Sequence, residues 1–396
     1  MLLKLSDRIQ RINVSQTIEM ARLSNQLRNN GTDVIDLSLG QTDFETPLHI
    51  REAAKAAIEA NFSGYTPPQG YPGLISAIVN KLKRENNLEY TAAEIMASNG
   101  AKHSIANVLQ VLIDIGDEVI LPAPYWVTYF DLIKLANGSP VVVQTKMDNY
   151  FKLTPQQLEL AITPRTRLLV LCSPSNPTGS AYTYSELEKL AEVLIRFPDV
   201  FILSDEIYEH LYFEGKHASI AQFSSLKSRV IIVNGISKSY SMTGWRLGYM
   251  AAHKDIISQC VKLQGQYTSN PSSISQKAAE AALNGGTECI DPIRNILLNR
   301  RNTVSEQLAL IPGIRFFPAQ AAFYMFPDFS SYYGKLLNNT LINNSEDMSL
   351  YILRNAHVAL VAGSAFGNDN CLRISLVTSV QKLTEACTRI AKVLYV

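Results

Sequence analysis

The sequence predicts an α/β fold in which a large domain, with a mostly parallel sheet flanked by helices, is joined to a smaller α+β domain. Two features predict it. Between about residues 46 and 280, short apolar segments rich in β-branched residues alternate with amphipathic helical segments, as in a parallel sheet covered on both faces. After about residue 285, a long helical segment precedes irregularly spaced strands and helices. We therefore expect a large domain over residues 46–285 and a small domain formed by residues 1–45 and 286–396.

The composition is that of a globular protein with a sizeable core. The chain has 396 residues, of which 46% are hydrophobic and 18% are charged, and its formal net charge is +1. This balance gives no support for nucleic acid or an anionic membrane as a partner. No apolar run approaches the ~18 residues of a membrane span. The N-terminus shows no apolar signal-peptide block, so we expect a cytoplasmic protein.

The cysteines and histidines show no metal-binding pattern. The five cysteines are scattered and odd in number, and the six histidines form no HExxH or paired arrangement. Reduced thiols in a cytosolic protein are the simplest account. We expect no metal site.

Residues 1–45 are expected to form an arm, a helix and a strand. The helix ends at Asn30-Gly31, a good stop signal, and residues 34–39 read as a strand ending at Gly40. That glycine is either a plain turn residue or a place where the backbone approaches a ligand.

In the large domain, the alternation of apolar strand-like and amphipathic helical segments predicts the elements in chain order. The expected strands are residues 94–98, 118–121, 140–145, 166–172, 200–203 and 230–233, and the expected helices include 51–61, 155–162 and 185–196, with others after Gly73 and Lys102. The loop 64–73, GYTPPQGYPG, contains too much proline and glycine for a helix or a central strand. It is expected to be a stiff loop that presents Tyr65 and Tyr71 in fixed positions.

Polar residues follow several of these strands directly. Gly100 and Ala101 begin a helix after strand 94–98, and a helix N-terminus suits a phosphate, although many such turns bind nothing. Trp126 follows two prolines and could pack in the core or stack on a planar heterocycle. Asn176 lies between two prolines in SPSNPTG, and Asp205 is either a helix N-cap or a buried carboxylate that needs a cation. Because the carboxyl ends of parallel strands share one edge of the sheet, these residues should lie together.

Lys238 stands just beyond strand 230–233, and Arg246 follows eight positions later. A desolvated lysine forms a Schiff base with a carbonyl, and arginine suits a phosphate. An aldehyde and a phosphate on one small molecule describe pyridoxal phosphate. The simpler interpretation is a strand, a serine-rich loop and a surface lysine.

The small domain is expected to be α+β. Its expected elements are helices 291–309, 346–355 and 380–394 and strands 314–317, 323–326, 358–361 and 372–376. Arg373, inside the last strand, is either paired structurally or a clamp for a carboxylate. Residues 332–345 are polar and are expected to be an exposed insertion.

Together these segments resemble the class I pyridoxal-phosphate-dependent aminotransferases, of fold type I, and most of all the bacterial subgroup of aspartate aminotransferases. The matching segments lie in the right order over nearly the whole chain: SLGQTDF, YTPPQGYPGL, NGAK, PYW, SPSNPTG, SDEIYEHLYFEG, SKSYSMTGWRLGY and CLRISL.

The resemblance implies a role for each residue. Lys238 would hold pyridoxal 5′-phosphate as a Schiff base and act as the catalytic base, Asp205 would bind the pyridine nitrogen, and Tyr208 would bond the ring 3-oxygen. The other implied cofactor contacts are Asn176 beside that oxygen, Trp126 stacked on the ring and, at the phosphate, the backbone of Gly100, Ala101 and Lys102 together with Ser237 and Arg246. Tyr65 would reach the phosphate of the neighbouring subunit, which implies a homodimer with shared active sites.

The resemblance also implies the substrates. Arg373 would clamp the α-carboxylate, near Gly40, Trp126 and Asn176, while Lys102, helped by Ser15 and Thr17, would contact a distal carboxylate. Aspartate and glutamate, with oxaloacetate and 2-oxoglutarate, are then the expected amino-acid and 2-oxo-acid substrates. The chain departs from the subgroup at His103, where glutamine is frequent, and at Gly235, where some relatives have a phosphate-binding serine.

Three alternatives remain open from the sequence. One is an aminotransferase with broader use of alanine or aromatic donors, and another is a carbon–sulfur lyase on the same scaffold, which would need the same lysine, aspartate and arginine. The third is a cofactor-binding regulatory protein without turnover, which no basic arm or DNA-binding segment supports.

Overall fold

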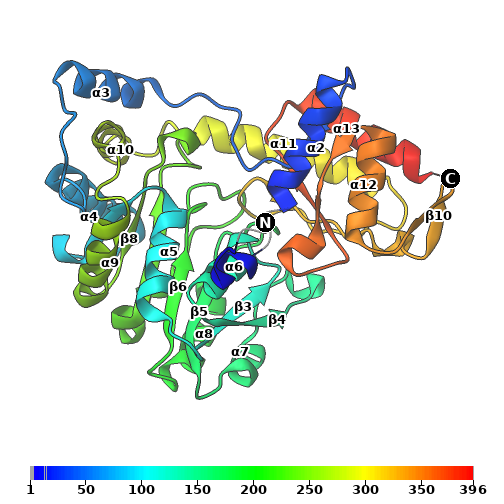
Figure 1. The fold of residues 1–396 in the computed structure, drawn as a ribbon. Coiled ribbons are helices and arrows are strands. Elements are labelled where there is room, and N and C mark those ends of the chain that lie inside the picture. The colour runs from blue at the N-terminus through cyan, green and yellow to red at the C-terminus, as the bar shows by residue number, and fades with distance from the viewer. Residues whose placement is uncertain (1–3, 13, 15, 396) are drawn as a thin grey trace.

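The computed structural model describes residues 4–12, 14 and 16–395, and a seven-stranded sheet forms its centre (Figure 1). The strand order is β2-β8-β7-β6-β5-β3-β4. The strands are β2 (Ile95–Ser98), β3 (Glu118–Ala123), β4 (Ser139–Gln144), β5 (Thr166–Cys172), β6 (Phe201–Asp205), β7 (Val230–Gly235) and β8 (Gly248–Ala251). Strands β3 to β7 pair in parallel, whereas β8 runs antiparallel to both β2 and β7. The prediction of a mostly parallel sheet is confirmed, although β8 was not predicted.

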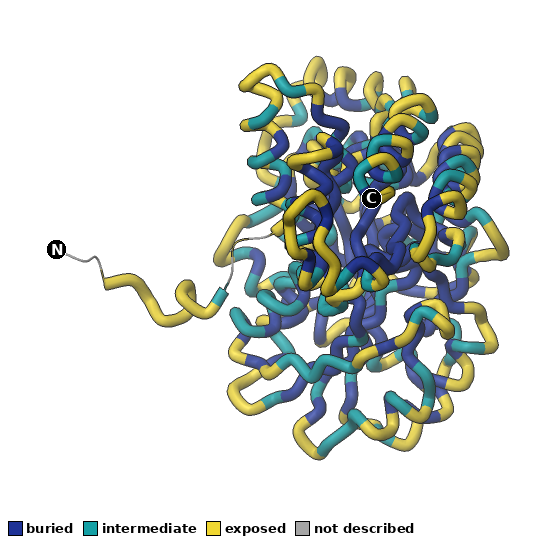
Figure 2. The backbone as a smooth tube through the Cα atoms, turned by 90° about the vertical axis from the view of Figure 1, so that its right-hand side faces the viewer, coloured by how far each residue is buried: buried dark blue, intermediate teal, exposed yellow. Residues whose placement is uncertain are grey.

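The sheet is covered on both faces, as its sequence pattern requires. All six residues of β7 are buried, and its first four, Val230 to Val233, form a continuous apolar run instead of an alternating pattern. Ile232 packs into one core with Leu187, whereas Ile231 packs into the opposite core with Ile105. Figure 2 shows this buried interior beneath more exposed helices.

The helices of this part are α3 (Leu48–Glu59), α4 (Pro72–Asn86), α5 (Ala101–Leu112), α6 (Thr128–Leu135), α7 (Pro155–Ala161), α8 (Tyr184–Ile195), α9 (Lys254–Tyr267) and α10 (Ser273–Asn284). Local chemistry fixes several starts: Thr183 and Glu186 form a capping box on α8, and Pro72 occupies the first position of α4. Helices α6, α9 and α10 were not predicted from the sequence.

The C-terminal part contains α11 (Asp291–Ala309), α12 (Ser345–Ala356) and α13 (Val380–Leu394), with a small sheet of β13 (Val361–Ala362), β14 (Leu372–Ser375) and β9 (Tyr324–Met325). Strand β1 (Ile35–Asp36) pairs in parallel with β12 (Val358–Ala359). This pairing brings α2 (Gln16–Asn29) beside the C-terminal helices, as Figure 1 shows. The α+β character is confirmed, while the domain boundary near residue 285 stays a prediction.

Three details of the C-terminal and N-terminal parts differ from the sequence prediction. Residues 314–317 form no strand, because only an isolated bridge links Arg315 to Asp328. The expected exposed insertion contains a hairpin of β10 (Lys335–Leu337) and β11 (Thr340–Ile342), whose Leu337 and Ile342 are buried and anchor it. Only two residues of the expected strand 34–39 pair, in β1.

The first described residues lie apart from the body. Helix α1 (Asp7–Gln10) has no buried residue and projects from the molecule in Figure 2. Among the described residues, none of the helices combines the length and the apolar character needed to traverse a bilayer.

Candidate active site

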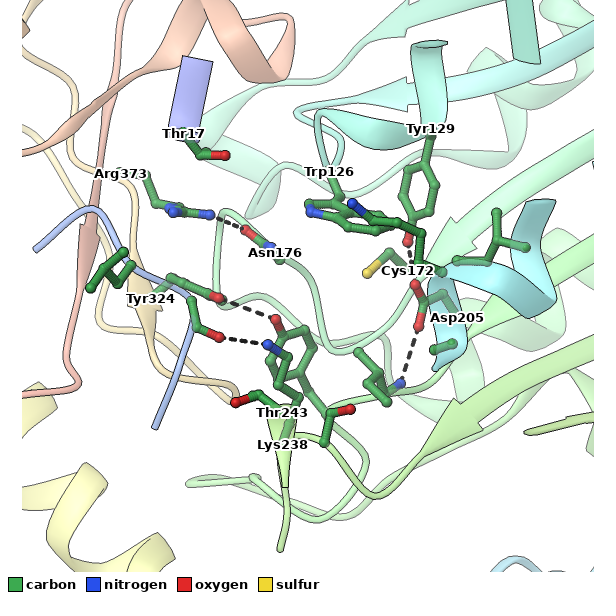
Figure 3. Close-up of a pocket in the computed structure, with 18 of the residues that line it drawn as sticks. Thr17, Trp126, Tyr129, Cys172, Asn176, Asp205, Lys238, Thr243, Tyr324 and Arg373 are labelled. Atoms are coloured by element: carbon green, nitrogen blue, oxygen red, sulfur yellow. Dashed lines mark hydrogen bonds between the residues drawn. The ribbon is translucent and has the colours of Figure 1, made fainter. Parts of the chain in front are cut away.

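A cavity of about 440 Å³ opens at the carboxyl ends of the parallel strands (Figure 3). It brings together most of the residues singled out from the sequence: Thr17, Gly40, Ala101, Lys102, Trp126, Asn176, Asp205, Tyr208, Ser237, Lys238, Arg246 and Arg373. Gly100 adjoins them as the residue before α5. Tyr65 does not line this cavity and is 91% exposed, and Ser15 lies outside the described residues.

Lys238 projects into the cavity from the loop that follows β7. Its Nζ donates a hydrogen bond to the Gly40 carbonyl oxygen at 2.5 Å. Burial, and then the charges of Arg373 and Arg246, lower the pKa of Lys238 to about 8. The interpretation as a solvated surface lysine is therefore wrong, and the amine is available as a nucleophile and base near neutral pH.

Asp205, the last residue of β6, is a buried carboxylate. Its Oδ2 accepts a hydrogen bond from the Tyr129 hydroxyl at 2.5 Å, and its Oδ1 accepts one from the Ile207 amide at 3.2 Å. Burial raises the pKa of Asp205 to about 6, although both hydrogen bonds act to lower it. No basic side chain in the described part of the chain lies within 4.0 Å to form an ion pair with it. A turn, not a helix, follows Asp205, so the N-cap interpretation is wrong, and the buried carboxylate suits a cationic ligand group.

Tyr129 is a site residue that the sequence reading missed. It lies on α6, three residues after Trp126, and the two rings meet edge to face at 5.2 Å between centroids. The Tyr129 hydroxyl has one hydrogen to donate in a hydrogen bond, and Asp205 accepts that bond. Helical spacing from Trp126 was the available signal, but α6 itself had not been predicted.

Arg373 forms the opposite wall of the cavity and is only 3% exposed. Its guanidinium donates to Asn176 Oδ1 at 3.0 Å and to the Ser38 carbonyl oxygen at 2.5 Å, while its Nε finds no hydrogen-bond partner in the part of the chain that the structure describes. Within the described residues, no carboxylate pairs with it. A buried arginine with an unused donor suits an incoming carboxylate.

Tyr324, the second residue that the sequence reading missed, supports this wall. Its ring lies 4.6 Å from the Arg373 guanidinium carbon, and its hydroxyl lies 3.2 Å from that of Tyr208. It belongs to β9, where the sequence predicted only a strand within residues 323–326. Both tyrosines therefore line the cavity together with Arg373 and Lys238, and Figure 3 shows Tyr324 on the side of Arg373.

A cradle for an anion lies at the N-terminus of α5. Gly100 has φ +85°, and a Cβ placed on it would lie 2.5 Å from Arg246 Nη2, so the turn needs a glycine. Arg246 is held by the Thr243 carbonyl oxygen at 2.9 Å and keeps other donors for a ligand. Burial, and then the charge of Arg246, lower the pKa of Lys102, a crowding of cations that an anion would relieve. With free N–H groups at the helix end, these residues suit a phosphate.

The two departures from the bacterial subgroup have simple structural settings. His103 Nδ1 accepts a hydrogen bond from the Asn99 amide at 3.3 Å, so the ring closes the turn before α5. At Gly235, a Cβ would lie 2.9 Å from Gly248 Cα, because β7 and β8 approach closely there. A serine at this position would require the two strands to move apart.

Known proteins resemble this chain over nearly its whole length. A family model described as aminotransferase class I and II matches residues 32–390. The chain is 43% identical over 396 residues to an aspartate/prephenate aminotransferase of Nitrosomonas europaea, a match covering 99% of this chain and 100% of that protein. It is 44% identical over 390 residues to an aspartate aminotransferase of Geobacillus stearothermophilus, covering 98% of each.

Solved structures agree with these matches. The aspartate aminotransferase from Rhizobium meliloti gives a TM-score of 0.96 at 40% identity, covering 99% of both chains. The aspartate aminotransferase from Thermus thermophilus with maleate gives a TM-score of 0.93 at 35% identity, covering 99% of this chain and 100% of that chain. The resemblance inferred from the sequence motifs is thereby confirmed.

Proposed function

The chain belongs to the class I and II aminotransferase family, and we propose that it transfers the amino group of L-aspartate to 2-oxoglutarate with pyridoxal 5′-phosphate as cofactor. The products are oxaloacetate and glutamate, formed by a ping-pong mechanism. The observation that carries the proposal is the position of the Lys238 amine between a buried carboxylate, Asp205, and a buried guanidinium, Arg373, neither of which has an ion-pair partner among the described residues.

The residues present fit this cofactor. Asp205 lacks a cationic partner among the described residues and would keep a proton on the pyridine nitrogen, while Trp126 offers its ring face. Tyr208 and Asn176 would hold the ring oxygen, and the α5 N-terminus with Ser237 and Arg246 would hold the phosphate. When bound, the cofactor supplies an aldehyde that condenses with amines and a ring that accepts electrons from the substrate Cα.

The chain's own residues then divide the work of the reaction. Lys238 Nζ, with its lowered pKa, is placed to attach the cofactor and to take the proton from the substrate Cα. Arg373 would bind the α-carboxylate through its free Nε and adjacent donors, which fixes the direction of the Cα–H bond. Most of the residues around the amine are buried, which limits its contact with water.

The mouth of the cavity supports a preference for dicarboxylic substrates. Lys102 Nζ lies 4.9 Å from the centre of the Trp126 ring, and Thr17 of α2 enters the cavity from the N-terminal segment. We place the distal carboxylate of aspartate between them. Ser15, the other residue proposed to help, lies outside the described residues.

Lys102→Ala tests this placement. We expect kcat/KM for aspartate to fall by about 10- to 100-fold, since a charge-assisted hydrogen bond contributes about 1.5–3 kcal/mol. For alanine, which has no distal carboxylate, kcat/KM should change by less than about threefold. The two donors are compared in single-turnover measurements on the same variant. Equal losses for both donors would contradict the contact between Lys102 and the distal carboxylate.

We also propose a homodimer with shared active sites. Tyr65 stands almost fully exposed on a stiff Pro/Gly-rich loop, and α1 projects from the body without a buried residue. Both features leave surface for a second copy, in which Tyr65 would reach the phosphate of the neighbouring site. Sedimentation of the wild-type protein tests the oligomeric state, and a monomer with full activity would exclude shared sites.

The function is tested by the absorption spectrum before and after adding aspartate alone. We expect a visible band to disappear while oxaloacetate forms in an amount matching the active sites. A band unchanged by aspartate would remove this donor and direct attention to alanine and aromatic donors. Pyruvate and ammonia released from a sulfur-containing donor would instead establish a carbon–sulfur lyase. A protein that shows no band when supplied with pyridoxal phosphate would overturn the proposal.

A further inference from the structure

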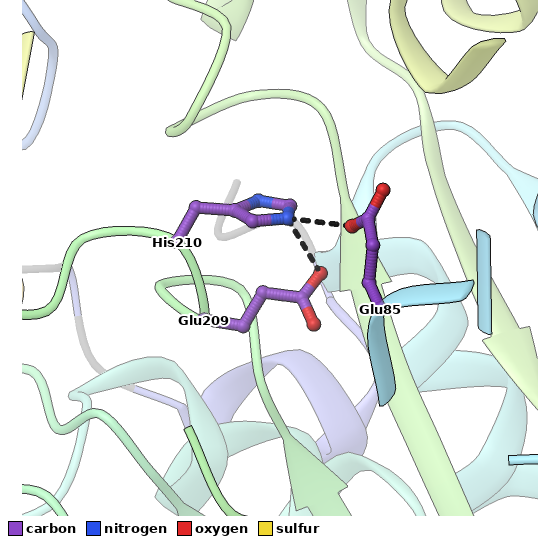
Figure 4. A group of neighbouring side chains, drawn as sticks. All are labelled: Glu85, Glu209 and His210. Atoms are coloured by element: carbon purple, nitrogen blue, oxygen red, sulfur yellow. Dashed lines mark hydrogen bonds and ion pairs between the residues drawn. The ribbon is translucent and has the colours of Figure 1, made fainter. Parts of the chain in front are cut away.

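A buried cluster of charged residues lies behind the active site, between α4 and the turn after β6. Figure 4 shows Glu85, Glu209 and His210, whose ligand-type atoms lie within 4.8 Å of one another. Lys81 is fully buried, and its Nζ contacts Glu209 and lies 3.7 Å from Glu85. Asn86 donates to the second oxygen of Glu209 at 2.8 Å. The Lys81 ammonium therefore already takes the place that a metal ion would occupy, and the cluster is a closed ion network.

His210 connects this cluster to the active-site loop. Its Nε2 lies 2.9 Å from Glu85 and 3.7 Å from Glu209. Carboxylates only accept, so Nε2 carries the proton and donates. The other ring nitrogen, Nδ1, lies 3.1 Å from the hydroxyl oxygen of Ser239. When the imidazole is neutral, its Nδ1 accepts a hydrogen bond from the Ser239 hydroxyl. When the imidazole is charged, Nδ1 donates a hydrogen bond to the same oxygen, so the contact is kept in both protonation states of His210.

Ser239 follows Lys238 directly, in a loop that is packed into the core through Ile236, Tyr240 and Met242 but has only long backbone hydrogen bonds of its own. Backbone hydrogen bonds of 3.1–3.4 Å, at the long end of the normal range, cross it from the amides of Tyr240, Ser241 and Met242. Ser241 has φ +55°, which is uncommon for a residue with a side chain. Ser239 itself is only 1% exposed. The hydrogen bond between the Ser239 hydroxyl and His210 therefore restrains the backbone next to Lys238.

His210 also lies two residues after Tyr208, which lines the cavity. The same imidazole therefore fixes the turn after β6 and the loop after β7 relative to each other and to α4. A shift of either loop would change the distance between Lys238 and the other groups of the site.

We propose that His210 is a positioning residue for Lys238: anchored by Glu85 and Glu209, it holds the Ser239 hydroxyl and so fixes the backbone from which the Lys238 amine reaches the cavity. This inference rests on the proposed role of Lys238 as the cofactor-binding lysine. It extends the catalytic apparatus by a chain of contacts that reaches α4 without touching substrate or cofactor.

Ser239→Ala and His210→Ala are the first variants to test. Both should lower kcat by about 10- to 100-fold, the scale expected when a reacting group is displaced by about 1 Å. The KM for aspartate should change by less than about threefold, because Arg373 and Lys102 are untouched. Ser239→Ala leaves the ion pairs of the cluster in place, so it should lower the stability of the fold less than His210→Ala does.

A readout independent of turnover is the rate at which the apo protein gains its visible band after mixing with pyridoxal phosphate. Both variants should gain it about 10-fold more slowly than the wild type, because the displaced amine meets the aldehyde less often in a productive orientation. Wild-type protein that gains no band would overturn the proposed function itself, and this inference with it. A wild-type band, with Ser239→Ala matching the wild type in both rate and kcat, would overturn this inference alone.

Two replacements at His210 separate positioning from packing. An asparagine places its amide near the former Nδ1 and can keep the Ser239 contact, whereas a glutamine places it near Nε2 and can keep only the Glu85 contact. We expect His210→Asn to retain more of the wild-type kcat than His210→Gln. The reverse order would contradict a role that acts through Ser239.

The matched control is Lys152→Met, which removes another buried lysine from its ion pair, here with the half-exposed Glu186 at 2.9 Å, far along the chain from the active-site loop. It should lower thermal stability as His210→Ala does, while the band formation rate and kcat stay at wild-type values. If Lys152→Met reduced both to the same extent as His210→Ala, the effect would be general destabilisation and the proposal would be wrong.

Discussion

Lys238→Ala is expected to lower kcat by about 10²- to 10⁴-fold, the contribution typical of a positioned general base. The variant should also lose the visible band that forms with pyridoxal phosphate. The physical reason is that Lys238 supplies the only lysine amine of the described cavity whose pKa is lowered to about 8 and that lies between Asp205 and Arg373. Single-turnover kinetics with aspartate and a spectrum of the purified variant measure both effects. The exposed Lys254→Ala variant is the control.

The same variant should be more stable than the wild type when no cofactor is bound. The pKa of Lys238 falls from 10.5 in the unfolded chain to about 8 in the folded one, first because of burial and then because of neighbouring cations. The unfolded chain therefore binds more protons between pH 8 and 10.5, and wild-type stability decreases as the pH falls through that window. The pKa shift lowers the free energy of unfolding of the wild type by about 3 kcal/mol, and this loss is complete below pH 8.

Denaturant unfolding of the two apo proteins at pH 7.5 and pH 10.5 checks this expectation. The stability difference in favour of Lys238→Ala should be largest at the lower pH and should nearly vanish at the higher one. A variant that is less stable than the wild type at both values would show that Lys238 is not buried among cations.

Asp205→Asn is expected to have the second-largest effect. The substitution keeps the size of the side chain and can keep the Tyr129 contact, but it removes the charge that would hold a proton on the pyridine nitrogen. Breaking a buried ion pair typically costs 3–5 kcal/mol, so cofactor affinity should weaken by more than about 10²-fold, and kcat should fall at saturating cofactor. Titration of the apo protein with pyridoxal phosphate measures the affinity.

In the absence of cofactor, Asp205→Asn is expected to raise the stability of the protein, although it weakens cofactor binding. Burial raises the pKa of Asp205 from 3.8 to about 6, so the folded protein binds more protons than the unfolded chain between these values. Wild-type apo stability therefore decreases as the pH rises from 3.8 to 6, by about 3 kcal/mol, and Asp205→Asn removes this loss. At pH 7 the variant should be the more stable apo protein and the weaker binder. Asp199→Asn, an exposed position before β6, should change neither quantity, and a similar loss of affinity there would contradict the assignment to Asp205.

Much of the large sheet could be predicted because its strands are buried on both faces. Such strands must be continuous apolar runs, and β5 and β7 were therefore located to within about two residues. The ends of these runs in turn placed Asp205 and Lys238 at one edge, since parallel strands present their carboxyl ends together. The short strands β1, β9 and β12 have only two residues each, and a segment of that length has no reliable periodicity.

What the sequence by itself determined was the order of polar residues along the chain and their positions after apolar strands. It located the lysine, the aspartate and the arginine of the candidate site, because each departs in chemical type from the apolar segment beside it. Those departures are local properties, visible within a few residues.

The tertiary structure alone decided which of these groups have partners. Tyr129 meets Asp205 across 76 positions and Lys238 meets Gly40 across 198, and no pattern of local periodicity encodes such contacts. The same is true of His210, which looked like one more scattered histidine until α4 and the Lys238 loop were seen to meet at its ring. The pKa of a buried group depends on desolvation and on charges brought near it by folding, so these values become defined only when distant segments pack together.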